Sequence, residues 1–278
     1  MNDHFAAFSF VDRITAFEPG VRARGIFAVP ADLPAFPACL VAEAVGQLAA
    51  WTAMDAIGFR GRPVAALATE TVFHGDVAPG SRLDLSVEVE SCDDEAIAYG
   101  GQAEVAGVRV IELKHCLGPM LPVADFDAPE ALRERLRLLR AEGAPAGRFR
   151  GVAPAEMSWL DGEPGRTARA LLRIPVSAPF FADHFPRRPV FPATLLLDSQ
   201  IRLALDLARA AITGTSALVA QRMTHVKMRA FIAPGADVVL GAELNGDRGL
   251  DDAVRLTAEI AGRTVATARL NLGAQEAR

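Results

Sequence analysis

Three ionisable side chains occur where a charge is costly, and together they could perform acid–base chemistry. His184 stands in the segment HFPRRP directly ahead of an apolar run, while Glu43 and Asp198 each interrupt an apolar stretch. An imidazole titrates near neutral pH and can act as a base, and a carboxyl group in dry surroundings keeps its proton to a higher pH than usual. A histidine and a carboxyl group at one site can therefore take a proton from one atom and give a proton to another.

The elements that carry these residues repeat along the chain. FPA at 36–38 recurs at 191–193, and APG at 78–80 recurs at 233–235, so both pairs are 155 residues apart. EPG at 18–20 recurs at 163–165, an offset of only 145. The second half must therefore contain ten extra residues, and they fall within 176–189, the segment that includes His184. The first half has no counterpart of this histidine.

Each half predicts the same set of elements. The stretches 38–56 and 193–210 follow a proline and are apolar all round, which predicts helices buried in a core. Alternating or β-branched patterns predict strands, with Gly107 and Gly262 in hairpin turns. The expected strands are 22–29, 82–90, 97–105 and 109–117, then 167–174, 237–244, 253–260 and 264–272. We expect an α+β fold in which each half packs one long helix on an antiparallel sheet.

The repeat also predicts where the chain divides. The two copies are expected at 1–127 and 152–278, and the second one carries the histidine segment. Between them, within 128–151, PEALRERLRLLRA at 129–141 predicts an exposed helix, and the Gly, Pro and Ala residues of 142–151 predict a linker. The basic run from Arg133 to Arg140 is interpreted as a solvated helix face and not as a docking site.

The region around His184 resembles the β-hydroxyacyl-acyl-carrier-protein dehydratases of bacterial fatty-acid synthesis. HFPRRPVFPA at 184–193 is similar to that family's H-F-P-G-x-P-x-x-P-G, and Asp198 follows His184 at the spacing of the family's catalytic carboxylate. FPACLVAEAVGQ at 36–47 is similar to its M-P-G-V-L-x-x-E-A-x-A-Q. Ala38, Ala193 and Arg187 stand where the family has glycine, which we interpret as an altered pocket shape. The resemblance implies the hot-dog fold, here as a tandem double hot dog.

The resemblance also implies an activity. The family dehydrates a 3-hydroxyacyl thioester to a trans-2-enoyl thioester, so we expect a role in biosynthesis of the fatty-acid or polyketide kind. The acyl group would be carried by acyl carrier protein or by coenzyme A. Its phosphopantetheine arm belongs to the substrate, and no further cofactor is expected.

The choice of carboxylate follows from how the family builds its site. That site resembles a shared one, with the histidine from one protomer and the carboxylate from the other. Applied to the two halves, this rule pairs His184 with Glu43 and ranks Asp198 second. The sequence has the same asymmetry, because Gln47, one helical turn after Glu43, has Arg202 as its counterpart. The reciprocal site, with Asp198 and no histidine, should be inactive.

Further residues are expected to contact the substrate. The backbone N–H of Ala193 or of Ala38, each at a helix start, is the expected donor to the thioester oxygen. The remaining candidates for substrate binding are Gln47, Phe185, Arg187 and Arg188. The two arginines, with Lys227 and Arg229, could receive a phosphate of the carrier, although a solvated charged face is an equally good interpretation. The bland interpretation is preferred for Cys39, as a buried small residue, and for His74, His115 and His225, as structural or exposed residues.

Composition excludes several other classes. The net charge of −5 argues against a nucleic-acid partner, and three cysteines without a CxxC or Cys/His cluster predict no metal site. The longest apolar stretch, 36–56, is broken by Glu43 and Gln47, which argues against a membrane span. Asp3 and His4 stand where a signal peptide would carry basic residues, so we expect a cytoplasmic protein. The fused pair already supplies the usual dimer, and a homo-oligomer of it is equally allowed.

Two alternatives to a dehydratase stay open. A hot-dog thioesterase would use a carboxylate to direct water and would not require His184. A non-catalytic subunit that binds acyl thioesters or their carrier protein would explain the missing loop in the first half and the lost glycines. Glu43 in the expected pair favours simple dehydration over further isomerisation of the double bond.

Overall fold

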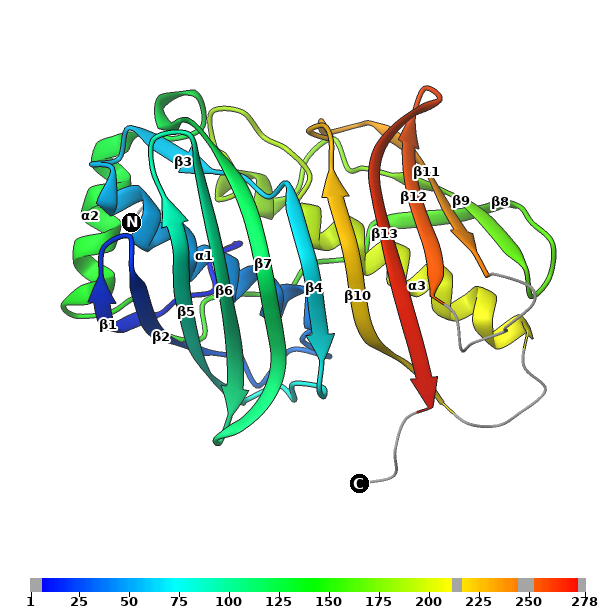
Figure 1. Ribbon diagram of the computed structural model, residues 1–278, viewed down its shortest axis with the longest axis horizontal. Coiled ribbons are helices and arrows are strands. Elements are labelled where there is room, and N and C mark those ends of the chain that lie inside the picture. Colours follow the sequence, from blue (N-terminus) through cyan, green and yellow to red (C-terminus); the bar gives the residue numbers. More distant parts are fainter. Residues whose placement is uncertain (1–6, 212–216, 245–252, 275–278) are drawn as a thin grey trace.

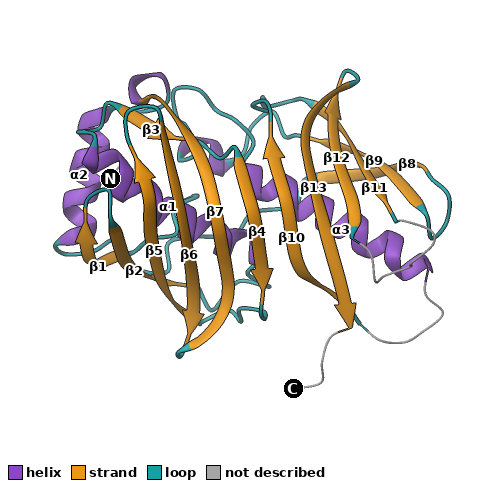
Figure 2. Cartoon of the chain, in the orientation of Figure 1, coloured by secondary structure: helices purple, strands orange, loops and turns teal. Residues whose placement is uncertain are grey.

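The computed structural model describes residues 7–211, 217–244 and 253–274, so Asp3 and His4 lie outside the described residues. Within them, one antiparallel sheet of thirteen strands runs the length of the molecule, and helices α1 and α3 lie along one side of it (Figure 1, Figure 2). Along the sheet the order is β1-β2-β5-β6-β7-β4-β10-β13-β12-β11-β9-β8, and β3 pairs with β7.

The predicted elements occur in the predicted order, together with five strands that were not predicted, β1, β3, β4, β8 and β10. The first half contains β1 (Arg13–Glu18), β2 (Arg22–Ala28), α1 (Ala38–Ala56), β3 (Gly61–Pro63), β4 (Leu67–Phe73), β5 (Arg82–Cys92), β6 (Ala96–Val105) and β7 (Val108–Pro122). A 3-10 turn, η1 (Val123–Asp125), and α2 (Pro129–Arg140) connect it to the second half. The second half contains β8 (Glu156–Asp161), β9 (Thr167–Arg173), the 3-10 turn η2 (Pro179–Ala182), α3 (Ala193–Ala211), β10 (Leu218–Met228), β11 (Asp237–Glu243), β12 (Val254–Ile260) and β13 (Arg263–Ala274).

The two predicted glycine turns are confirmed as hairpins. Ala106 and Gly107 join β6 to β7 with φ angles of 51° and 79°, and Ala261 and Gly262 join β12 to β13 with φ angles of 48° and 74°. Two consecutive positive φ values are those of a type I′ turn, whose twist matches that of the flanking strands. The glycine takes the second position in both turns, as this turn type requires.

The halves meet at the centre of the sheet. β4 of the first half pairs antiparallel with β10 of the second, from Val72 opposite Arg222 to Leu67 opposite Lys227. α1 packs on β2, β5 and β6, α3 packs on β9, β10 and β11, and the two helices contact each other. The N-terminal ends of both helices therefore approach the middle of the molecule, where the segment with His184 also lies (Figure 1).

Helix α3 differs from its prediction. α1 is apolar on most sides and buries eleven of its nineteen residues. α3 is amphipathic instead, because Asp206 and Arg209 pair with each other at 3.0 Å on an exposed face. The prediction of an apolar helix all round was therefore wrong for α3, whose outer side faces solvent.

Helix α2 is not the exposed helix that was predicted. Leu132, Leu136 and Leu139 form a stripe at i, i+4 and i+7 that is buried, together with Arg135. Only the opposite side of the basic run, with Arg133, Arg137 and Arg140, is exposed. The prediction overlooked that the leucine stripe needs a core to cover it.

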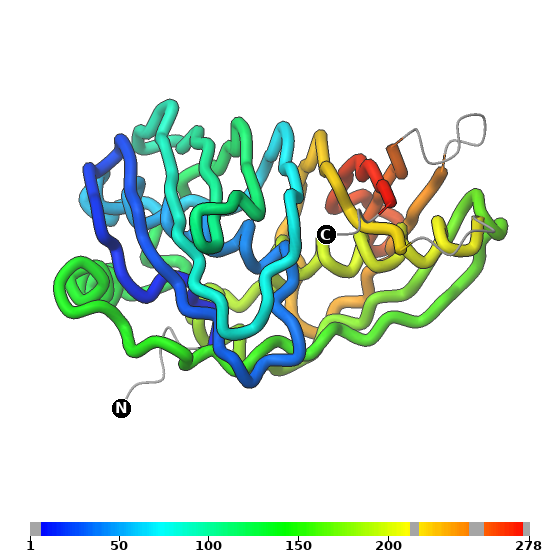
Figure 3. Tube along the Cα trace, turned by 90° about the horizontal axis from the view of Figure 1, so that it is seen from below, coloured from blue at the N-terminus to red at the C-terminus, as the bar shows by residue number. Residues whose placement is uncertain are grey.

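The predicted linker is also anchored to the core. From α2, the chain crosses the side of the helices that faces away from the sheet and reaches β8 (Figure 3). On the way the ring of Phe149 packs edge-on against Phe10 and Phe36, with ring centres 5.0 and 6.1 Å apart. The connection thereby holds the N-terminal segment against the first half.

Two absences concern the described residues alone. None of the helices in the described ranges is both long and apolar enough to span a membrane. In these same ranges, no three His, Cys, Asp or Glu side chains gather in a way that could hold a metal ion.

Candidate active site

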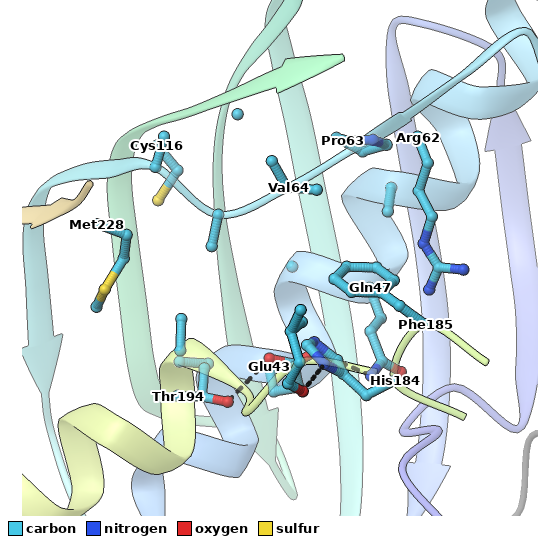
Figure 4. A pocket seen from close by; sticks show the side chains of 18 of the residues that line it. Glu43, Gln47, Arg62, Pro63, Val64, Cys116, His184, Phe185, Thr194 and Met228 are labelled. Atoms are coloured by element: carbon cyan, nitrogen blue, oxygen red, sulfur yellow. Dashed lines mark hydrogen bonds between the residues drawn. The ribbon is translucent and has the colours of Figure 1, made fainter. Parts of the chain in front are cut away.

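A cavity of about 240 Å³ lies where the two halves meet. Glu43 and Gln47 of α1 line it from the first half, and His184 and Thr194 line it from the second. Figure 4 shows Glu43, Thr194 and His184 close together, with Cys116 and Met228 farther along the cavity. The arrangement brings an imidazole and a carboxyl group from distant parts of the sequence to one cavity with mainly apolar walls.

His184 is held as a neutral imidazole. Its Nδ1 lies 3.0 Å from the carbonyl oxygen of Val190, which can only accept, so Nδ1 carries the proton and Nε2 keeps its lone pair. Burial lowers the pKa of His184 to about 3, and the charge of Arg62 acts in the same direction, against the hydrogen bond to Val190. The side chain is therefore in its proton-accepting form over the physiological pH range.

Glu43 is fixed by hydrogen bonds to both carboxyl oxygens. Thr194 Oγ1 donates to Oε2 at 2.9 Å across the interface between the helices, and Gln47 Nε2 donates to Oε1 at 3.0 Å. Burial raises the pKa of Glu43, and these two hydrogen bonds and the charge of Arg62 oppose the rise. A carboxyl group with a raised pKa keeps its proton longer and can donate it.

The N-terminal segment ties the two functional side chains together. Gln47 Nε2 also donates to Phe8 O at 3.0 Å, and Gln47 Oε1 accepts from Phe10 N at 2.8 Å. Asp183, the residue before His184, accepts from Ala7 N at 2.5 Å and from Phe8 N at 2.8 Å. One short stretch of backbone thus connects the Glu43 side of the site to the His184 side.

Replacing Asp183 with Ala should destabilise the fold, because its buried carboxylate satisfies two backbone N–H groups. We expect the free energy of unfolding to fall by about 1–3 kcal/mol for a buried donor left unpaired. Urea unfolding of the variant and the wild type measures it. The control is Asp161→Ala, which removes an exposed ion pair to Arg169 and should cost at most about 1 kcal/mol. Equal losses in the two variants would contradict this role of Asp183.

The loop that carries His184 is clamped by the first half. Phe185 has a φ of 65°, a conformation that costs a residue with a Cβ about 1–2 kcal/mol. Its ring packs on Phe126 at 4.9 Å between ring centres, and the guanidinium of Arg62 lies 4.6 Å from its centre. Arg62 Nη1 in turn donates to the buried carboxylate of Asp127 at 3.0 Å, and the Arg62 side chain of this ion pair is partly buried. These contacts hold Phe185, and with it the neighbouring His184 backbone, in one position.

The structure divides the predicted site residues into two groups. His184, Glu43, Gln47, Phe185 and Ala193 all line the cavity. Ala193 is also the first residue of α3, so its N–H has no acceptor within the helix.

The other predicted residues lie outside the cavity. Arg187 and Arg188 are exposed: Arg187 Nη1 donates to Ala124 O at 2.9 Å, and Arg188 stacks on Phe231, which does line the cavity. Ala38 is also outside, so of the two predicted oxyanion donors only Ala193 lines the cavity. The histidines at 74, 115 and 225 are exposed.

Asp198, the repeat counterpart of Glu43, does not line the cavity. Its own pKa is raised by burial, an effect that Arg202 opposes. Burial and the charge of Asp198 together raise the pKa of the buried Cys39 thiol. Cys39 and Thr194 are repeat counterparts 155 residues apart, and so are Glu43 and Asp198. The proximity of Cys39 to Asp198 in the second half is therefore the counterpart of the contact between Thr194 and Glu43.

Sequence reasoning missed three residues of the site. Thr194 follows the predicted Ala193 directly, and its position could have been found by asking what faces Glu43 across the two helices. Arg62 comes from the three-residue strand β3 and Asp127 from the segment between η1 and α2, and no local pattern distinguishes them. Their pairing depends on tertiary structure alone.

Comparisons with known proteins support the same family. A profile for ApeI dehydratases, described as ApeI-like, matches residues 161–266. The 3-hydroxyacyl-[acyl-carrier-protein] dehydratase FabZ of Streptococcus mutans is 31% identical over 103 residues, which cover 36% of this chain and 73% of that protein. FabZ of Albidiferax ferrireducens is 34% identical over 84 residues, 29% of this chain and 56% of that protein.

Solved structures with the same fold include thioesterases. A tesB protein of Mycobacterium avium subspecies paratuberculosis has a TM-score of 0.57 at 14% identity, covering 95% of this chain and 96% of that one. A putative oleoyl thioesterase of Lactobacillus plantarum has a TM-score of 0.60 at 8% identity, covering 92% and 97%. At these identities the likeness shows the hot-dog fold alone.

The fold and the matched sequence define a hot-dog protein of the dehydratase type. The chain belongs to the family of the FabZ 3-hydroxyacyl-[acyl-carrier-protein] dehydratases.

Proposed function

We propose that this protein dehydrates 3-hydroxyacyl thioesters to trans-2-enoyl thioesters at one composite site. The observation that carries the proposal is the pairing of His184 and Glu43, from opposite halves of the chain, in one cavity. Their surroundings give them opposite protonation tendencies: the imidazole is neutral and the pKa of the carboxyl group is raised. Such a pair supplies the base and the acid of an elimination.

The proposed reaction moves protons and releases water. His184 Nε2 takes the proton from the carbon next to the thioester carbonyl, and the electron pair of that C–H bond forms the new C=C bond. The bond from the third carbon to its hydroxyl breaks as Glu43 gives that oxygen a proton, so that water leaves. The N–H of Ala193 at the start of α3 stabilises negative charge on the thioester oxygen. Because nothing is oxidised or reduced, the reaction needs no cofactor.

We propose that the architecture is a tandem double hot dog. In this proposal residues 1–127 and 152–278 are the two copies, and 128–151 form the connection with its helix. The supporting observation is that α1 and α3, and the hairpins β6–β7 and β12–β13, occur at the same offset of 155 residues. The copies stand in for the two protomers that a single-domain relative would need.

A single active site is proposed because α3 carries larger side chains than α1 at the positions equivalent to three that line the cavity. In α1, Ala42, Gly46 and Ala50 line the cavity and leave it open. At the equivalent positions, 155 residues later, α3 has larger side chains, namely Leu197, Ile201 and Leu205. In addition, a counterpart site around Asp198 would have no histidine, because the first half lacks a segment equivalent to that of His184.

The thioester is proposed to arrive on a phosphopantetheine arm, attached either to acyl carrier protein or to coenzyme A. Arg188, stacked on Phe231 at 5.1 Å, stands beside the cavity wall and is a candidate for the phosphate, with Arg187 next to it. Lys227 and Arg229 are exposed on either side of Met228 in the sequence, and Met228 also lines the cavity. It stays a prediction that the partner is acyl carrier protein or acyl coenzyme A. Further association of copies of this chain is also a prediction.

One assay separates this function from its alternatives. The protein is incubated with 3-hydroxyacyl thioesters of coenzyme A and of acyl carrier protein, and both the enoyl absorbance and the released thiol are followed. A dehydratase forms enoyl thioester without thiol. Thiol without enoyl product would instead support a thioesterase, and binding without either product would support a non-catalytic subunit.

The pH profile of kcat/KM should reflect the two shifted groups. His184, with a pKa lowered to about 3, is already a base well below neutrality, so activity should not decline as pH falls through about 6.5. Activity should decline on the alkaline side, as Glu43 loses its proton through its raised pKa. Stopped assays across the pH range measure the profile.

The pH profile of kcat/KM needs a control for acid unfolding. A histidine buried as the neutral form takes up a proton on unfolding, so its contribution disfavours the folded state increasingly as pH falls from about 6.5 toward 3. Circular dichroism at each pH shows whether the fold is intact. An acid limb near pH 6.5 in a folded protein would contradict the assignment of His184.

A further inference from the structure

The cavity extends away from His184 along one face of α1. The residues of α1 that line it after Glu43 recur at three- and four-residue intervals, as one helix face does: Gly46, Gln47, Ala50, Trp51 and Met54. From Glu43 to Met54 the helix rises about 16 Å. The cavity is therefore much longer than the reacting carbons require, and it runs toward the C-terminal end of α1.

Helix α2 stands at that far end. Arg133 Nη2 donates to Gly58 O at 3.0 Å, and its guanidinium lies 5.4 Å from the ring of Phe59, so α2 is fastened just beyond the end of α1 (Figure 1). Leu132 and Leu139 of α2 line the same cavity as His184, and each is only 1% exposed. The third leucine of the stripe, Leu136, is also buried but does not line this cavity.

The far part of the cavity has mainly apolar walls. Trp51 and Met54 of α1 line the cavity together with the leucines of α2, and Ile97 and Leu113 line it from the sheet. Arg135, between the two leucines, also lines the cavity. Burial lowers its pKa, the charge of Arg148 acts in the same direction, and the charges of Asp183 and Asp12 oppose the shift. Walls of this kind favour an unbranched hydrocarbon chain, because each methylene removed from water adds to binding.

We propose that α2 is the end wall of the acyl pocket, and that Leu132 and Leu139 set the longest chain that the site accepts. The inference rests on the proposed function, since it takes the acyl group of the thioester as the occupant. α2 belongs to the connection between the halves and contributes no group to the proton transfers. Chain-length selectivity is thus built by a segment separate from the residues that do the chemistry.

The test compares three leucine variants of the same helix. Leu132→Ala and Leu139→Ala open the end of the cavity, and we expect the chain-length optimum of kcat/KM to move to longer straight-chain 3-hydroxyacyl thioesters. The gain should be roughly fourfold for each added methylene that the opened space accepts. Leu139→Phe fills the end and should lose the longest substrates while it keeps the shortest.

Leu136→Ala is the matched control. It removes the same side chain from the same buried stripe, so it should lower thermal stability like the other two variants without moving the chain-length optimum. An unchanged optimum in both Leu132→Ala and Leu139→Ala would overturn the proposal. The same shift in Leu136→Ala would overturn it as well, because loosening of α2 alone would then explain the effect.

A binding measurement separates this inference from the proposed function. Calorimetry with enoyl pantetheine thioesters of increasing length reports the longest chain that fits, whether or not turnover occurs. If the wild type binds these ligands without turnover and the length limit moves in the leucine variants, the end wall stands and the dehydratase proposal fails. If turnover occurs and the limit does not move, the end wall fails and the dehydratase proposal stands. Absence of both binding and turnover would overturn both.

Discussion

His184→Ala should abolish nearly all enoyl formation, with a loss of about 10²–10⁴-fold in kcat. The imidazole is the base of the proposed elimination, and its Nε2 keeps a lone pair because Nδ1 donates to Val190 O. In the first half the equivalent segment is ten residues shorter and has no histidine that could substitute. Absorbance of the conjugated enoyl thioester at saturating substrate measures the effect.

The control for this variant is His225→Ala, which changes an exposed histidine on β10. It should leave kcat unchanged. Thermal unfolding of both variants shows whether His184→Ala is still folded at the assay temperature. A folded His184→Ala protein that keeps more than a small fraction of wild-type activity would mean that another group takes the proton.

Glu43→Gln should lower kcat by about 10²–10³-fold, because an amide keeps the size of the side chain but has no proton to give. The amide oxygen can still accept from Thr194, so the contact across α1 and α3 is retained, whereas the amide nitrogen cannot accept from Gln47 Nε2. The effect therefore reports the acid function more than the packing. The same enoyl assay measures it, with KM determined in parallel to separate binding from chemistry.

Asp198→Asn is the matched control for Glu43→Gln. Asp198 is the repeat counterpart of Glu43, is also a partly buried carboxylate in a helix, and lies outside the cavity. We expect this variant to keep most of the activity. A larger loss in Asp198→Asn than in Glu43→Gln would place the working acid on α3 and contradict the composite site.

The regular elements could be predicted from local pattern. The bounds of α1 follow from a proline before an apolar run, and the two hairpins follow from Gly107 and Gly262, which supply the positive φ of a type I′ turn. The buried face of α2 could also be predicted, because Leu132, Leu136 and Leu139 form an apolar stripe at i, i+4 and i+7. The alternating charges of α2 favour the opposite interpretation, a solvated helix, and the structure shows that the leucine stripe is buried.

Part of the candidate site could be predicted by comparing the two halves of the repeat. The ten-residue difference singles out the segment of His184, and the exchange of Gln47 for Arg202 singles out the helix of Glu43. Arg62 could not be found this way, because its contacts with Asp127 and Phe185 join three segments that are far apart in the chain. Such contacts arise from tertiary structure and leave no periodic signal in the sequence.

The central claim is that His184 and Glu43 act together at one site, and a double variant tests it most directly. We would measure kcat/KM for His184→Ala, Glu43→Gln and the double variant in the enoyl assay. Two residues that serve one reaction as a unit are strongly non-additive, so the double variant should be about as slow as the slower single variant. If instead the two losses multiply, the side chains act independently, and the single composite site would be contradicted.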